Sequence, residues 1–261
     1  MIKVGVTGAL GRMGKEVVKT VIANPEMELV CAIDKFETGS NVCGNVAIES
    51  DIVKSIELNK PDVIVDFTDP ASVFQNTKTY LENKVKPVIG TTGLSKEQIE
   101  ELKKLSKENN TGCLIAPNFA IGAVLMMMFA KTAAKYFNNA EIIELHHNRK
   151  KDAPSGTAIK TAQMMAEVNP NMQTGNIKDT EIIQGARGGL FNEDGKGNIN
   201  IHSVRMPGFV ASQEVIFGAN GQILTIKHDT SNRECFMSGV ELAIKYVSKN
   251  NDFIFGLENI L

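Results

Sequence analysis

One short segment of the sequence gathers side chains that can exchange protons and hold anions. The segment AEIIELHHNRKKDAPSGTAIK (140–160) contains two adjacent histidines and then three cations, namely His146, His147, Arg149, Lys150 and Lys151. Histidine titrates near neutral pH and can act as a proton donor. Lysine supplies a fixed positive charge for an anion or for developing negative charge. The segment is therefore a candidate pocket for a small dianion with proton donors beside it.

A helix start follows the cations directly. Pro154 and Ser155 suit the first positions of a helix, and Asp152 just before them can anchor the loop. The N–H groups near Gly156 and Thr157 could then bind a carboxylate, helped by the helix dipole and by the Thr157 hydroxyl.

The residues before the cations predict a strand, in which neighbouring side chains face opposite sides. His146, His147 and Lys150 can therefore reach one pocket only if the backbone bends just after His147. We assign Arg149 and Lys151 to solvent or to a subunit contact. A basic surface turn without a site is the alternative interpretation that the residues leave open.

A glycine-rich turn near the start of the chain has the spacing of a phosphate-binding loop. The run VGVTGALGRMG places Gly8, Gly11 and Gly14 between a strand and a helix, where backbone N–H groups can meet a pyrophosphate. Asp34 ends the next expected strand, where an acid can accept hydrogen bonds from an adenosine ribose. Lys35 could meet a 2′-phosphate, so NADH and NADPH both stay open. A purely structural turn, or another nucleotide-like ligand, is the alternative.

Two further segments follow expected strands and would lie at the same edge of the sheet. GTTG (90–93) follows KPVI, and APNFA (116–120) follows CLI. The backbone and hydroxyl groups of Thr91 and Thr92, and the ring of Phe119, could line the nicotinamide end of a dinucleotide. Without the glycine loop, both segments would be interpreted as ordinary connecting turns.

The elements that position these residues differ between the two halves of the chain. In the first half, apolar strand-like runs alternate with helical ones, including a helix from about Arg12 to Ala23. A second helix begins with a capping box formed by Ser95 and Gln98. Buried strands that alternate with helices predict a parallel sheet covered on both sides.

The second half is rich in strand-like runs and predicts a separate mixed or antiparallel sheet. The runs are AEIIELHH, TEIIQGARGG, NINIHSVRMP, ASQEVIFG and GQILTIKHDT. GANG (218–221) predicts a hairpin turn between the last two. The final run SNRECFMSGVELAIKYVSK predicts a long amphipathic helix with a capping box of Ser231 and Glu234. His202 and His228 are single residues within strands, and we expect them to be structural.

Composition limits the classes of function. With 261 residues, 43% of them hydrophobic, the chain can bury a sizeable core. Lys and Arg number 28 against 30 Asp and Glu, so no global charge draws the protein to nucleic acid or to an anionic membrane. The longest uncharged stretch, Asn109 to Ala130, is interrupted too often to span a bilayer. Four scattered cysteines have no metal-ligand spacing and predict buried thiols of a cytosolic protein: Cys31, Cys43, Cys113 and Cys235.

The chain as a whole resembles a known enzyme family. The run ELHHNRKKDAPSGTA is similar to the signature of the 4-hydroxy-tetrahydrodipicolinate reductase (dihydrodipicolinate reductase) family of lysine and diaminopimelate synthesis. The runs VGVTGALGRMG, DFTDP (66–70), GTTG and APNFAIGAVLMM resemble further family motifs and occur in the family's order. Ala120 departs from the pattern, because many relatives have Ser there; backbone contacts would survive that change.

The resemblance implies an α/β protein with a Rossmann-like parallel sheet domain and a smaller α+β domain with a mixed or antiparallel sheet. The first domain would comprise residues 1–118 and 229–261, including the C-terminal helix. The second, residues 119–228, would bind the substrate and build a homotetramer. No nucleic-acid or membrane partner is expected.

The resemblance also implies a role for each site residue. His146 would be the proton donor, and Lys150 a second catalytic donor or charge stabiliser. The substrate carboxylates would be gripped by His147, Gly156 and Thr157. NADH or NADPH would be held by Gly8, Ala9, Leu10, Gly11, Arg12, Met13, Asp34, Lys35, Gly90, Thr91, Thr92, Ala116, Pro117, Asn118 and Phe119. No metal site is expected.

The activity implied is reduction of a cyclic hydroxy-imine dicarboxylate by NADH or NADPH with loss of water. Another two-domain NAD(P)-dependent dehydrogenase, acting on an amino acid or a semialdehyde, is one alternative. A semialdehyde dehydrogenase needs a nucleophilic cysteine, and Cys113 lies inside an expected strand. A non-catalytic NAD(H)-sensing module is the alternative from another class.

Overall fold

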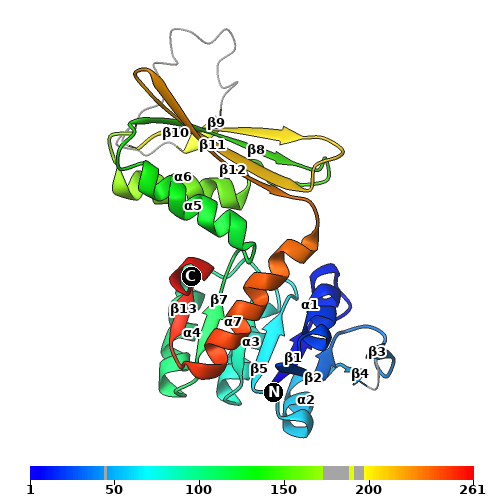
Figure 1. Ribbon diagram of the computed structural model, residues 1–261. Helices are drawn as coiled ribbons and strands as arrows, with labels where there is room; N and C mark the ends of the chain where they lie inside the picture. Colours follow the sequence, from blue (N-terminus) through cyan, green and yellow to red (C-terminus); the bar gives the residue numbers. More distant parts are fainter. Residues whose placement is uncertain (44–45, 173–187, 191–196) are drawn as a thin grey trace. The chain divides into compact units, whose positions relative to one another are not determined.

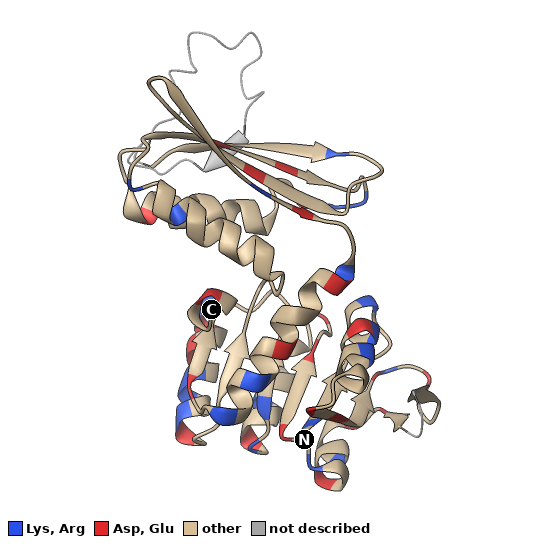
Figure 2. Cartoon of the chain, in the orientation of Figure 1, with Lys and Arg blue, Asp and Glu red and all other residues tan. Residues whose placement is uncertain are grey.

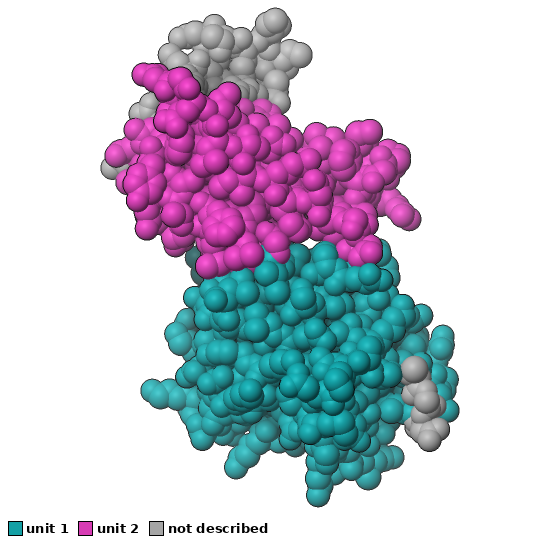
Figure 3. All heavy atoms as spheres, in the orientation of Figure 1, with its two compact units in different colours: residues 1–121, 233–261 teal, residues 122–232 magenta. Residues whose placement is uncertain are grey.

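The structure, a computed structural model, describes residues 1–43, 46–172, 188–190 and 197–261. The chain forms two compact units (Figure 3), unit 1 from residues 1–121 and 233–261 and unit 2 from residues 122–232. We expected divisions at 118/119 and 228/229. The chain divides three to four residues later at each place, since helix α5 begins at Ile121 and strand β12 continues to Thr230.

Unit 1 is built on a mostly parallel sheet with the strand order β13-β7-β6-β5-β1-β2-β4-β3 (Figure 1). Its strands are β1 (Ile2–Thr7), β2 (Met27–Ile33), β3 (Asn41–Cys43), β4 (Val46–Glu49), β5 (Val63–Asp66), β6 (Lys86–Ile89), β7 (Cys113–Ile115) and β13 (Phe253–Phe255). In the described part of this sheet, only β3, which pairs with β4, runs antiparallel to its neighbour. Strand β1 lies where the order reverses, between β2 and β5. The predicted Rossmann-like sheet is confirmed.

Helices cover both faces of this sheet. They are α1 (Arg12–Ala23), α2 (Ile52–Asn59), α3 (Val73–Glu82), α4 (Lys96–Glu108) and α7 (Met237–Lys249). Helices α1 and α7 contact each other, while α2, α3 and α4 form the second layer. The capping box predicted at α4 is confirmed, since Gln98 N donates to Ser95 Oγ (3.2 Å) and Ser95 N donates to Gln98 Oε1 (2.9 Å). Figure 2 shows basic and acidic segments interspersed along these helices, in keeping with the net charge of −2.

The C-terminal helix begins later than the capping-box pattern predicts. A 3₁₀ turn, η1 (Arg233–Phe236), comes first, and α7 starts only at Met237. None of the η1 side chains is buried, whereas the buried face of α7 includes Met237, Val240 and Ile244. Packing against β5, β6 and β7 therefore fixes the start of the α-helix more strongly than the local cap does.

Unit 2 pairs a mixed five-stranded sheet with two helices. The strand order is β12-β11-β8-β10-β9, with β8 and β10 parallel and the other pairs antiparallel. The strands are β8 (Asn139–His146), β9 (Gly188–Leu190), β10 (Ile199–Arg205), β11 (Ala211–Ala219) and β12 (Gln222–Thr230). Helices α5 (Ile121–Ala133) and α6 (Gly156–Val168) pack on one face of this sheet (Figure 1), and the core between them includes Ile142, Met165 and Phe217.

Two expectations for this half concern its strands. The hairpin at GANG is confirmed, because β11 and β12 pair up to Ala219 and Gln222, and Gly221 takes φ +75° in the turn. Most of the strand-like run TEIIQGARGG (180–189) lies outside the described residues; only its end falls in β9. Of the helices that the structure describes, none combines the length and apolarity needed to cross a membrane.

Candidate functional site

The glycine loop of unit 1 joins β1 to α1 and depends on missing side chains. Gly8 takes φ +77°, and a Cβ there would clash with the carbonyl oxygen of Phe67. A Cβ on Gly14 would overlap the carbonyl oxygen of Gly8. The first helical bond of α1 runs from Lys15 N to Gly11 O (3.0 Å), so the N–H groups before it make no bond within the helix. These donors suit an anion such as a pyrophosphate.

A cavity of ≈ 640 Å³ opens beside this loop, at the carboxyl ends of β1, β2 and β5. Five of the predicted cofactor residues line it, namely Gly8, Leu10, Gly11, Asp34 and Lys35. Three others in the loop do not: Ala9 is buried, Arg12 is exposed and Met13 is half-buried. The volume is that of a small-molecule site, and its place at the strand-order reversal is where open α/β sheets bind ligands.

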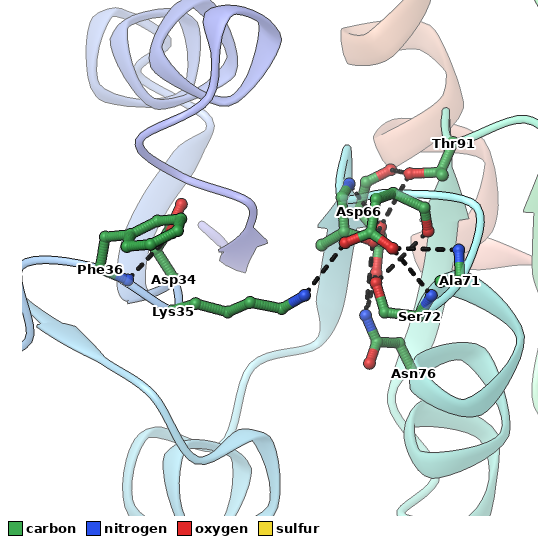
Figure 4. Close-up of polar contacts among 10 residues, drawn as sticks. Asp34, Lys35, Phe36, Asp66, Ala71, Ser72, Asn76 and Thr91 are labelled. Carbon is green, nitrogen blue, oxygen red and sulfur yellow. Dashed lines mark hydrogen bonds and ion pairs between the residues drawn. The ribbon is translucent and has the colours of Figure 1, made fainter.

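The acid and the lysine at the end of β2 are both engaged in the structure. Asp34 accepts hydrogen bonds from Leu10 N (2.9 Å) and Phe36 N (3.3 Å), which ties it to the glycine loop. Lys35 extends toward the start of α3 (Figure 4), where its Nζ lies 3.1 Å from Asp69 Oδ2. The hydrogen bond from Lys35 is the main reason that the pKa of Asp69 lies below its usual range. Asp69 lines the same cavity, and sequence reasoning missed it.

A buried carboxylate holds the opposite wall of the cavity together. Asp66 at the end of β5 is fully buried. It accepts hydrogen bonds from Thr68 Oγ1 (2.7 Å), Asn76 Nδ2 (3.1 Å), Tyr80 Oη (2.8 Å) and Thr91 Oγ1 (3.0 Å). Figure 4 shows Asn76 and Thr91 turned toward it. The Thr91 hydroxyl is thus occupied by the protein, which leaves the backbone of Thr91 for a cofactor.

The two segments predicted for the nicotinamide end meet at one aromatic ring. A Cβ on Gly90 would overlap the ring of Phe67, and the rings of Phe67 and Phe119 lie 5.7 Å apart. Phe119 is only 2% exposed, so its ring belongs to the core of unit 1, and contact between it and a cofactor stays a prediction. The others differ in exposure: Ala116 is buried, Asn118 half-buried, and Thr92 and Pro117 exposed. The missed residue Phe67 follows a buried strand in DFTDP, a signal of position that could have found it.

In unit 2, the histidine segment leaves the sheet in the predicted bend. Strand β8 ends at His146, and a turn follows in which Lys150 N donates to His147 O (3.1 Å). The bend after the histidines is confirmed. Arg149 N also donates to His147 Nδ1 (3.2 Å), and Lys150 Nζ lies 2.8 Å from Asp152 Oδ2. Asp152 therefore anchors the loop, as the sequence predicted.

Helix α6 follows, and there is open space beside Gly156 in its first turn. Ser155 caps α6 by accepting a hydrogen bond from Ala158 N (3.2 Å). Gly156 is exposed, and a Cβ on it would meet no atom within 4 Å. Thr157 is half-buried beside it. The start of α6 thus has the space that a carboxylate would need at a helix N-terminus.

A second carboxylate, which sequence reasoning missed, lies beneath the histidine. Glu144 is fully buried, and its Oε2 lies 2.5 Å from His146 Nδ1. Arg205 of β10 donates two hydrogen bonds to it, from Nη1 to Oε2 (2.8 Å) and from Nη2 to Oε1 (2.7 Å). The sequence signal was available, because residues two apart on a strand share a face.

The ionisation of Glu144 follows from these contacts. Burial raises its pKa, but hydrogen bonds from His146, Arg205 and Ser203 and the charge of His146 outweigh burial and lower the pKa to about 2. Glu144 is therefore ionised at neutral pH and holds no proton that it could donate.

Two cysteines with buried side chains are poorly suited to act as nucleophiles. Cys31 and Cys113 are buried and form no disulfide. Burial raises the pKa of Cys31 to about 12 and raises that of Cys113 as well, so neither is a ready nucleophile. Among the described residues, no group of His, Cys, Asp or Glu side chains is arranged to hold a metal ion.

Comparisons with known proteins cover the whole chain. The family model described as "Dihydrodipicolinate reductase, N-terminus" matches residues 2–119, and "Dihydrodipicolinate reductase, C-terminus" matches residues 122–261. The chain is 51% identical to 4-hydroxy-tetrahydrodipicolinate reductase of Listeria innocua, and the match covers all of both chains. It is 49% identical to 4-hydroxy-tetrahydrodipicolinate reductase of Lysinibacillus sphaericus, and that match covers 100% of this chain and 99% of the relative. Among solved structures, it is similar to dipicolinate-bound dihydrodipicolinate reductase from Paenisporosarcina sp. TG-14, with a TM-score of 0.89, 46% identity and full coverage of both chains.

Proposed function

Because the chain belongs to the dihydrodipicolinate reductase family, we propose that it reduces 4-hydroxy-tetrahydrodipicolinate to tetrahydrodipicolinate with NADH or NADPH and loss of water, in the diaminopimelate route to lysine. One observation carries the proposal at the level of the site. A single strand-turn-helix segment supplies His146, Lys150 and the open start of α6. These are the groups that a dianionic, proton-accepting substrate requires.

Unit 1 binds the cofactor in this proposal. The backbone of the loop 8–13 holds the pyrophosphate, Asp34 holds the adenosine ribose, and Lys35 is available to a 2′-phosphate. The nicotinamide end lies near the backbone of residues 90–92 and 116–119. The lining of the ≈ 640 Å³ cavity by Asp34, Lys35 and the glycine loop supports this assignment.

Unit 2 binds the dicarboxylate and donates the proton in this proposal. His147 and the N–H groups of Gly156 and Thr157 grip the carboxylates, and Lys150 stabilises developing negative charge or donates a second proton. NADH or NADPH, when bound, would supply the hydride for C4 of the conjugated imine formed by loss of water, which leaves an enamine. His146 then protonates the resulting enamine carbon. Fixing the substrate in this orientation can contribute on the order of 7–11 kcal/mol towards the barrier.

A coupled assay tests the proposal. The product of condensation of pyruvate with aspartate semialdehyde is supplied, and the loss of reduced-nicotinamide absorbance is followed once with NADH and once with NADPH. We expect turnover with at least one of the two cofactors. A protein that binds NADH and never oxidises it with this substrate would instead be an NAD(H)-sensing module. The semialdehyde dehydrogenase alternative is disfavoured by the burial and raised pKa of Cys113.

The choice between NADH and NADPH is expected to depend on Asp69. Its carboxylate holds Lys35 Nζ at 3.1 Å and would repel a 2′-phosphate that approached the same lysine. We predict that Asp69→Asn raises the ratio of kcat/KM for NADPH to kcat/KM for NADH by roughly 1.5- to 5-fold, the size expected when one exposed ion pair is lost. Asn keeps an oxygen for the N–H groups of Ala71 and Ser72, so the turn before α3 keeps its hydrogen bonds.

Two controls accompany the Asp69 variant. Glu101→Gln removes another exposed ion pair of unit 1, with Lys78 (2.7 Å), and should leave the cofactor ratio unchanged. In a Lys35→Met background, Asp69→Asn should lose most of its effect. A ratio that stays constant, or shifts toward NADH, in Asp69→Asn would contradict the assignment of Lys35 to the 2′-phosphate.

Assembly and location complete the proposal. We assign the protein to the cytoplasm and to a homotetramer built through the sheet of unit 2. In β8, the half-buried Ile143 and Leu145 alternate with buried Ile142 and Glu144, so an apolar part of the sheet faces away from the helices and supports such an assembly. Sedimentation velocity of the purified protein checks the assembly, and a monomer at assay concentration would contradict it.

A further inference from the structure

One buried carboxylate connects three parts of unit 2. The side chain of Glu144 contacts the ring of His146 at the end of β8 and the guanidinium of Arg205 at the end of β10. Its Oε1 also accepts a hydrogen bond from Ser155 N (3.2 Å), the residue that caps α6. The imidazole assigned as proton donor and the helix start assigned to the substrate carboxylate therefore share a single anchor.

The contact between Glu144 and His146 selects one tautomer of the ring. An ionised carboxylate can only accept, so the Nδ1 atom at 2.5 Å must carry the proton in this hydrogen bond. The other ring nitrogen, Nε2, is then the one available to the substrate. When Nε2 gives its proton to the enamine carbon, the ring that remains is neutral with its proton on Nδ1, which is the form that the carboxylate stabilises.

The third partner, Arg205, fixes the carboxylate itself. Its two terminal nitrogens bind both oxygens of Glu144, and the same nitrogens donate to Val204 O (2.8 Å) and Asp152 O (2.7 Å). Because the side chain of Asp152 also holds Lys150, the guanidinium braces both ends of the bend that carries the two assigned catalytic residues.

We propose that Glu144, held by Arg205, is the positioning residue that orients His146 and keeps its proton on Nδ1 throughout the reduction. This inference rests on the function proposed above for His146. It assigns to Glu144 no direct contact with the substrate, and it separates the group that gives the proton from the group that determines which nitrogen gives it.

The same sheet contains a matched control pair. Glu141, also on β8, lies with its Oε2 2.7 Å from Nε2 of His202 on β10. This pair has the same chemistry as Glu144 and His146, on the same two strands that carry the positioning network, and has no assigned role in the reaction. Its loss should affect the sheet without affecting the proton donor.

The experiment compares Glu144→Gln with Glu141→Gln. For Glu144→Gln, we expect kcat to fall at least ~10-fold, since losing the partner that orients a catalytic histidine costs from about 10-fold to about 10⁴-fold. KM for the substrate should change little. The solvent deuterium isotope effect on kcat should increase, because protonation of the enamine carbon becomes rate-limiting. NADH binding, which depends on unit 1, and all the constants of Glu141→Gln should stay at wild-type values.

A second variant guards against misfolding, because Glu144→Gln leaves Arg205 without its anionic partner. Glu144→Asp keeps the negative charge for Arg205 and withdraws the carboxylate from the ring by one methylene. It should fold with a wild-type circular dichroism spectrum and show the same loss of kcat. A folded Glu144→Asp or Glu144→Gln with wild-type kcat and isotope effect, or with only a raised KM, would overturn the proposal.

Nitrogen-15 NMR of the ring of His146 tests the tautomer without turnover. In the wild-type protein the neutral ring should carry its proton on Nδ1, and in Glu144→Gln the shifts should move toward the mixture seen for an unrestrained imidazole. Wild-type protein that shows the Nδ1–H form and no turnover would contradict the proposed function and leave the positioning role standing. A wild-type ring protonated on Nε2 alone would contradict the positioning role, whatever the activity.

Discussion

Replacing His146 by Gln is expected to lower kcat by roughly 10²–10⁴-fold, the usual contribution of a positioned general acid. Glutamine can occupy the space and offer an amide to Glu144, whose carboxylate lies 2.5 Å from the ring in the wild-type protein. It cannot transfer a proton to carbon. Since the acid acts in the transition state, KM for the substrate should change far less than kcat. Steady-state kinetics at saturating NADH and NADPH measure both constants.

His202→Gln is the matched control for this variant. His202 also lies at a β-strand position beside a glutamate, with its Nε2 2.7 Å from Glu141 Oε2. Its replacement should leave kcat within experimental error, even if it lowers the melting temperature. If His146→Gln raised KM and left kcat intact, His146 would be a binding residue, and the proton would have to come from elsewhere, with Lys150 the first candidate.

Replacing Gly14 by Ala is expected to weaken NADH binding by more than ~10-fold, which corresponds to about 1.4 kcal/mol. A Cβ at this position overlaps the carbonyl oxygen of Gly8 and lies 2.7 Å from Gly8 C and 2.9 Å from Ala9 Cα. All of these are backbone atoms, so no side chain can rotate away, and the loop must move relative to the helix start that we assign to the pyrophosphate. Isothermal titration with NADH gives the affinity, and thermal unfolding followed by circular dichroism shows whether the variant is folded.

Alanine substitutions at two other glycines serve as comparisons for Gly14→Ala. A Cβ on Gly11 comes no closer than 3.1 Å to Gly8 O, so Gly11→Ala should weaken NADH binding less than Gly14→Ala. Gly218→Ala, in β11 of unit 2, meets no atom within 4 Å and should bind NADH as the wild-type protein does. Wild-type affinity in folded Gly14→Ala would show that the loop does not need the close approach, and the assignment of this turn to the pyrophosphate would lose its support.

Local patterns predicted the parts of the fold that local forces determine. The boundaries of α1 follow from the glycine turn before Arg12 and from Asn24 and Pro25 after Ala23, and the structure agrees at both ends. The hairpin at GANG depends on a glycine that takes φ +75°. The start of α7 was predicted less well, because packing of Met237 and the residues after it against the sheet outweighed the apparent cap at Ser231.

The residues of the candidate site also form two groups: those that sequence spacing identifies and those that only the fold brings together. Gly8, Gly11 and Asp34 could be found from spacing alone, since a strand, a tight turn and a helix follow one another in the chain. Spacing alone does not identify Phe67 and Asp69: their position after a buried strand is a signal, but the place of β5 beside β1 in the sheet is what brings them to the cavity. Arg205 is far from Glu144 in sequence, and only the parallel pairing of β10 with β8 brings it there.

The histidine segment shows why attention to charge alone was insufficient. The cations drew the interpretation toward an anion pocket, whereas the acid Glu144 is the residue that joins His146, Ser155 and Arg205. An i, i+2 pairing of acid and histidine in a predicted strand is a pattern worth seeking, because both side chains must then face the same way.

The return of the chain from unit 2 to unit 1 has a consequence for synthesis on the ribosome. Strand β13 pairs with β7, and α7 covers β5, β6 and β7 with side chains such as Val240 and Val247 that are fully buried. All of unit 2 has been translated while residues 233–261 are still inside the exit tunnel. At that stage, the apolar face of β5, β6 and β7 that α7 will cover is still exposed to solvent. The last layer of unit 1 can form only once residues 233–261 have emerged from the tunnel, and until then unit 1 is the part that a chaperone would have to shield.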